Sequence, residues 1–122
     1  MKFLWTTVYV NNMDESVAFY TDVAGLKVQS RFPAGPGAEI TFLGNGTDNE
    51  TLVELMADSR RGTASYGESI SIGFAVDSAA AMLDSVTGKG IPVFSGPVET
   101  PTYKFFGVQD PSGLHVQFFE KK

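Results

Sequence analysis

Residues 3–26 read FLWTTVYVNNMDESVAFYTDVAGL, and this stretch decides the fold. Up to Val10 the side chains alternate in character, a period of two that is typical of a β-strand. From Met13 onward apolar residues recur every three or four positions, which predicts a helix. Asp14 is expected to cap this helix, and Gly25 is expected to end it in a left-handed conformation.

The same strand and helix pattern occurs again in residues 69–93, which read SISIGFAVDSAAAMLDSVTGKGIPV. Here Asp77 or Ser78 can cap the helix, and Gly88 and Gly90 end it. Further alternating segments, separated by Gly- and Pro-rich turns, follow in both halves, at 26–32, 38–43, 50–56, 91–98, 102–109 and 114–120. The chain is therefore expected to contain two modules with the order βαβββ.

Composition limits the classes of function. With 122 residues, 43% of them apolar, the chain fits one compact domain or two halves sharing a core. A net charge of −5 and scattered basic residues disfavour nucleic acid. No apolar run approaches the roughly 20 residues of a membrane helix, and no leader precedes the first strand, which predicts no membrane partner and a cytoplasmic location. Without cysteine there are no disulfides or thiolate sites.

Residue parity divides the predicted strands into two faces. One parity is apolar and suits packing against the helices, with Leu4, Val8, Val10, Val53, Leu55, Ile70, Ile72, Phe74, Val76, Val116 and Phe118. The other parity is mixed, with Trp5, Thr7, Tyr9, Glu54, Ser69, Ser71, His115 and Gln117. Such a mixture suits a ligand-binding cup, although the polar outer face of an antiparallel sheet is the alternative. Two large aromatic side chains on this face favour the cup.

Three segments, in this order, carry a resemblance to a known family. They are VYVNNMDESVAFY at 8–20 with the following Gly25-Leu26, GFAVD at 73–77, and DPSG at 110–113 before the last strand. Together they resemble the glyoxalase/bleomycin-resistance/dioxygenase group, the vicinal oxygen chelate superfamily, over nearly the whole chain.

This resemblance implies an α+β fold in which two βαβββ modules form a curved, mostly antiparallel eight-stranded sheet cup with the helices on the outer face. It also implies a single domain over residues 1–122. Its modules are expected at about 1–57 and 68–122, joined by a polar linker at 58–67.

Metal-using members of this superfamily bind a divalent ion with one residue from each of four strands, usually His and Glu. The resemblance places these positions at Trp5, Glu54, Ser71 and Gln117. Glu54 is an orthodox ligand and Gln117 could offer a carbonyl oxygen. Trp5 has no lone pair to give, however, and Ser71 is a poor ligand for a transition metal. We therefore expect no metal or other cofactor; a divalent metal at Glu54 and Gln117 is the disfavoured alternative.

Two titratable side chains are candidates for catalysis. Glu54 could act as a general base, anchor a cationic ligand, or form a salt bridge with a loop Lys or Arg. His115 is the only histidine, and it faces the same way as Gln117 two residues later. It could be a base, a hydrogen-bond partner or a substitute ligand, or a strand residue without a functional role.

The expected function is that of a metal-independent small-molecule-binding protein, like the drug-sequestering bleomycin-resistance members. Its expected ligand-binding residues are Trp5, Thr7, Tyr9, Glu54, Ser71, His115 and Gln117. The alternative is an enzyme of the superfamily, similar to lactoylglutathione lyases, isomerases or dioxygenases, that uses Glu54 with or without a metal. A homodimer is expected as well, because family members commonly pair two chains and open sheet edges favour a partner.

Overall fold

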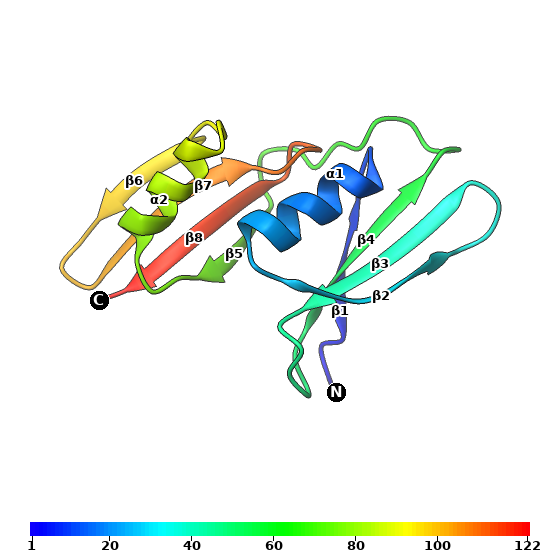
Figure 1. The fold of residues 1–122 in the computed structure, drawn as a ribbon, viewed down its shortest axis with the longest axis horizontal. Helices are drawn as coiled ribbons and strands as arrows, with labels where there is room; N and C mark the ends of the chain where they lie inside the picture. The colour runs from blue at the N-terminus through cyan, green and yellow to red at the C-terminus, as the bar shows by residue number, and fades with distance from the viewer. The chain divides into compact units, whose positions relative to one another are not determined.

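Two βαβββ units make up the chain in the computed structural model, which describes all of residues 1–122 (Figure 1). The first unit, Met1–Ala64, contains β1 (Trp5–Tyr9), α1 (Met13–Ala18), a π-helical turn (Phe19–Val23), β2 (Lys27–Pro33), β3 (Ala38–Gly44) and β4 (Leu52–Asp58). The second unit, Ser65–Lys122, contains β5 (Ser71–Ala75), α2 (Ala79–Gly88), β6 (Ser95–Glu99), β7 (Tyr103–Gln109) and β8 (His115–Lys121). The units divide after Ala64, inside the expected linker.

Each unit forms a four-stranded mixed sheet. The strand orders are β1-β4-β3-β2 and β5-β8-β7-β6, so the two units repeat one topology. The first strand of each unit runs parallel to the last, and the other neighbouring strands are antiparallel. The predicted α+β fold with two βαβββ modules is therefore confirmed. No helix of the chain has the length and apolar character needed to span a membrane.

Both helices begin at a side chain that caps them, but only one of these caps was predicted correctly. In the first unit the cap is Asn12, whose side chain accepts a hydrogen bond from the amide of Glu15. Asp14 lies inside the first helical turn, because the last residue with extended backbone angles is Asn12. Ser78 caps α2, as one of the two expected choices. Gly25 has a φ of 76° and ends the first helical segment as predicted.

Each helix covers one face of the sheet in its own unit (Figure 1). The buried apolar residues under the first helix and its π-helical turn are Val8, Val10, Met13, Phe19, Tyr20, Leu43 and Leu55. Their counterparts in the second unit are Ala79, Val86, Phe106, Val108, Leu114, Val116 and Phe118. The parity prediction fails at Leu4 and Ile70, which are 50% and 59% exposed. Both residues precede the first paired residue of their strands, so neither reaches the helix.

The turn between β7 and β8 fixes where the last strand begins. The Asp110 carboxylate accepts hydrogen bonds from the amides of Ser112 and Leu114, each 2.9 Å long, and Gly113 has a φ of 96°. This is the turn that the DPSG sequence predicts, and it makes His115 the first residue of β8. The expected strand 91–98 instead begins at Ser95 and contains a bulge before Val98.

Candidate functional site

One face of the first sheet carries four of the predicted site residues. Thr7 on β1 is paired with Glu54 on β4, and Glu54 is paired with Phe42 on β3. Alternate residues of a strand point to one side, so Trp5 and Tyr9 share the side of Thr7. We call this surface the Glu54 face, defined by Trp5, Thr7, Tyr9, Phe42 and Glu54. It is opposite to the face that packs against α1.

Glu54 is the most distinctive group on this face because it is only 6% exposed. The Thr7 hydroxyl donates to Glu54 Oε1 over 2.5 Å, and Glu54 has no other hydrogen-bond partner. The ion pairs of the chain involve other carboxylates, so the predicted alternative of a salt bridge at Glu54 is wrong. Oε2 has no partner within the protein, but it is not fully buried, so a donor group of another molecule can reach it.

Aromatic rings lie on the same face of the sheet as this carboxylate. The Trp5 and Phe42 rings meet edge to face with their centroids 5.4 Å apart, and Phe42 stacks on Phe32 of β2 at 6.2 Å. Trp5 remains 44% exposed, so its ring is available to a ligand. The Glu54 face therefore combines one acceptor oxygen with large apolar surfaces.

Tyr9 already carries a cation. The guanidinium carbon of Arg61 lies 3.8 Å from the centroid of the Tyr9 ring, a distance typical of a cation–π contact. Arg61 follows β4 near the end of the first unit, in a polar segment that the sequence predicted only as a linker.

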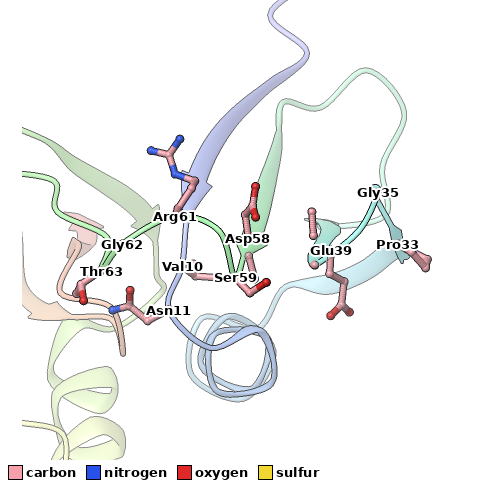
Figure 2. Close-up of a pocket in the computed structure, with 13 residues that line it drawn as sticks. Val10, Asn11, Pro33, Gly35, Glu39, Asp58, Ser59, Arg61, Gly62 and Thr63 are labelled. Atoms are coloured by element: carbon pink, nitrogen blue, oxygen red, sulfur yellow. The ribbon is translucent and has the colours of Figure 1, made fainter.

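A groove of about 790 Å³ opens at the end of the first sheet, next to this ring contact (Figure 2). None of the seven predicted site residues lines it. Two carboxylates do line it, but Asp58 is paired with Arg60 and Glu39 with Arg31. In Figure 2 the side chains of Asp58 and Arg61 point away from that of Glu39. Both carboxylates of the groove thus already have an arginine partner outside its lining, and we assign the groove no ligand.

The second unit brings the remaining predicted residues together. Ser71 on β5 is paired with His115 on β8, and the Ser71 hydroxyl donates to Oε1 of Gln117 over 3.4 Å. His115 Nε2 lies 2.9 Å from the hydroxyl of Ser95 on β6, above Gly107 of β7. We call this surface the Gln117 face, defined by Ser71, Ser95, Gly107, His115 and Gln117. It offers neutral hydrogen-bonding groups.

Sequence reasoning missed four contributors to these faces. Phe42 and Ser95 lie on strands whose register was not predicted. Gly107 contributes by having no side chain. Arg61 belongs to a segment without periodicity. The alternation of Phe42 with Leu43 would have indicated its face; the other three depend on tertiary structure.

The positions that the resemblance assigns to metal ligands fit a metal poorly. Within neither unit do three or more His, Asp or Glu side chains lie close enough to hold an ion. The indole of Trp5 contacts Phe42, and the hydroxyl of Ser71 bonds to Gln117. Only Glu54 presents a charged oxygen, so these residues do not form an orthodox ligand set.

Comparisons with known proteins agree with the topology. The profile of the Glyoxalase/Bleomycin resistance protein/Dioxygenase superfamily matches residues 2–118. A lactoylglutathione lyase of Neisseria meningitidis serogroup A is 33% identical over 132 residues, covering 100% of this chain and 92% of the relative. A lactoylglutathione lyase of Escherichia coli O157:H7 is 29% identical over 131 residues, covering 100% of this chain and 94% of the relative.

Solved structures share the fold at lower identity. Glyoxalase I of Leishmania major superposes with a TM-score of 0.84 at 23% identity, covering 98% of this chain and 86% of that one. TnmS3, an antibiotic-binding protein from Streptomyces, superposes with a TM-score of 0.75 at 18% identity, covering 100% and 97%. The order of the elements, the paired modules and the profile match thus agree, and the chain belongs to the Glyoxalase/Bleomycin resistance protein/Dioxygenase superfamily.

Proposed function

We propose that this protein binds a small organic molecule without a metal, and that the Glu54 face is its principal contact surface. The observation that carries this proposal is the state of Glu54. Its carboxylate is nearly buried, unpaired with Lys or Arg, and bonded on one oxygen only. A cationic donor of a ligand placed at Oε2 would form a charge-assisted hydrogen bond with this accessible oxygen.

The surroundings of Glu54 favour a planar organic cation. A carboxylate attracts the charge, and the rings of Trp5 and Phe42 can stack on or enclose the flat part of such a molecule. The Tyr9 ring on the same face is already covered by the Arg61 guanidinium, so a ligand would contact Trp5 and Phe42 instead. A cation–π contact is worth about 0.5–1 kcal/mol when exposed and about 2 kcal/mol when desolvated.

Benzamidinium, a flat aromatic cation, is a suitable test ligand, and benzamide is its neutral counterpart. Trp5 is the only tryptophan, so its fluorescence reports on the Glu54 face alone. We expect benzamidinium to change Trp5 fluorescence with a Kd of about 1 mM, which corresponds to a binding free energy of roughly 4 kcal/mol. Benzamide should bind to the Glu54 face at least about tenfold more weakly. A chelator should not alter the titration, and protein purified without chelator should contain far less than one divalent ion per chain. Stoichiometric metal at Glu54 would contradict the proposal.

The similarity to lactoylglutathione lyases favours one other function, that of an enzyme. In this case Glu54 would act as a general base, with its second oxygen directed at the substrate. Turnover of S-lactoylglutathione by the wild-type protein, lost in Glu54→Gln while binding is retained, would support the enzyme. Absence of turnover by the wild-type protein, together with weaker benzamidinium binding in Glu54→Gln, would support the binding protein.

We further propose a homodimer. Each sheet has two edge strands, and every residue of the edge strand β2 is exposed. Sedimentation at micromolar concentration should give about twice the mass of one chain. A strictly monomeric result would overturn this part of the proposal.

A further inference from the structure

The His115 imidazole reaches across its neighbouring strand. Its strand, β8, pairs with β7, where Gly107 lies opposite Gln117. A Cβ atom added to Gly107 would stand 2.2 Å from His115 Nε2 and 2.5 Å from Ser95 Oγ. The bond between Ser95 and His115 therefore occupies the space that a side chain at position 107 would fill. Only glycine at this position lets the imidazole span β7 to reach β6.

Two further contacts define the ring. Nε2 lies 2.9 Å from Ser95 Oγ, and Phe94 packs edge-on against the imidazole with centroids 5.1 Å apart. His115 has no other polar partner, so Nδ1 is left for another molecule. The half-buried Ser95 hydroxyl has no other side-chain partner. Its proton is therefore donated to Nε2, which acts as the acceptor. An imidazole that accepts at Nε2 carries its own proton on Nδ1.

Gln117 adds a second donor on this face. Its Oε1 accepts from Ser71, which leaves the amide nitrogen and its two hydrogens outward. Glycine flanks Gln117 on both sides, Gly73 on β5 and Gly107 on β7. A Cβ atom at Gly73 would meet nothing within 4 Å, so this side of Gln117 is open.

We propose that Ser95 and Gly107 are positioning residues that hold His115 in its Nδ1–H tautomer. The Nδ1–H group and the Gln117 amide then recognise a carbonyl or carboxylate oxygen of a small molecule bound at the Gln117 face. The ligand part of this inference rests on the proposed binding function, whereas the orientation of His115 does not. The Gln117 face is thus a donor surface, in contrast to the acceptor at Glu54.

Because His115 is the only histidine, its ring nitrogens give a single set of ¹⁵N NMR signals. At a pH where the imidazole is neutral, the wild-type protein should show a protonated Nδ1 and an unprotonated Nε2. Ser95→Ala should shift this pattern toward the tautomer mixture of a free imidazole. Gly107→Ala should do the same, because its Cβ displaces the ring. Gly73→Ala is the matched control: it also adds a methyl group beside Gln117, and it should keep the wild-type signals.

Benzamide, which carries a carbonyl oxygen, tests the ligand part. Benzamide should perturb the Nδ1–H signal in the wild-type protein and in Gly73→Ala. It should bind about three- to tenfold more weakly to Ser95→Ala and to Gly107→Ala. A tautomer pattern unchanged in both Ser95→Ala and Gly107→Ala would overturn the positioning role, and an Nε2–H tautomer in the wild-type protein would overturn the donor assignment. Benzamidinium could leave Trp5 fluorescence unchanged while His115 shows the expected tautomer. This result would overturn the proposed function at Glu54, but not the positioning role of Ser95 and Gly107. Ser95→Ala keeps the test decisive if Gly107→Ala does not fold.

Discussion

Replacing Glu54 with glutamine should weaken benzamidinium binding by about thirtyfold or more, measured through Trp5 fluorescence. The substitution keeps the size and one acceptor oxygen of the side chain but removes its charge. Removing one partner of a desolvated charge pair costs about 2 kcal/mol or more, which corresponds to roughly thirtyfold in Kd. The effect is large because Glu54 is 6% exposed and therefore screened little by water.

The same variant should remain folded. Glutamine Oε1 can still accept from the Thr7 hydroxyl, so the free energy of unfolding should change by no more than about 1 kcal/mol. Glu15→Gln is the matched control, since it makes the same change of charge at an exposed helix position. It should bind benzamidinium within about twofold of the wild-type protein, as expected for a charge screened by solvent. Equal weakening by both variants would mean that only net charge matters, and unchanged binding in Glu54→Gln would remove Glu54 from the site.

The sequence predicts the fold well because the fold depends on local periodicity. The hydrophobic period changes between Val10 and Met13, which predicts a strand followed by a helix. The same change of period occurs again near Ser78 and predicts the second module. Helix starts are less certain, because neighbouring polar residues compete for the cap. Asn12 and Asp14 both have suitable side chains, and only the backbone angles of Asn12 decide between them.

The sites are less predictable because they depend on register between strands. Parity places Thr7, Glu54 and Gln117 on the correct faces. It cannot show that the Thr7 hydroxyl reaches Glu54, or that His115 crosses Gly107 to bond to Ser95. The bulge after Ser95 also shifts the pairing of β6 with β7, and no short-range pattern indicates it.

The two faces differ in their chemistry despite their common topology. Glu54 and Gln117 occupy equivalent positions on the last strand of each unit, yet one is a charged acceptor and the other a neutral amide. Thr7 donates to the first and Ser71 to the second, so a β-strand hydroxyl orients each group.

Phe118→Ala should lower the free energy of unfolding by about 3–5 kcal/mol, whereas Phe119→Ala should lower it by at most about 1.5 kcal/mol. The two residues are adjacent on β8 and identical in type, but they point to opposite faces. Phe118 is fully buried on the helix side, between Phe74 and Phe106, so its removal leaves a cavity. Phe119 is 40% exposed and stacks on Tyr103 and Phe105 on the other side.

Urea unfolding of the two variants, followed by circular dichroism, measures this difference directly. A typical domain has a free energy of unfolding of about 5–15 kcal/mol, so a loss of about 3–5 kcal/mol is a large part of it. Phe118→Ala should therefore unfold at a much lower urea concentration than the wild-type protein. Because side chains alternate with a period of two, a register one residue different would exchange the two results. Equal losses in the two variants would contradict the assignment of β8 as a strand with one buried face. Comparing the stability losses of the two variants therefore tests the alternation of side chains along β8. The same alternation places His115 and Gln117 on the open face.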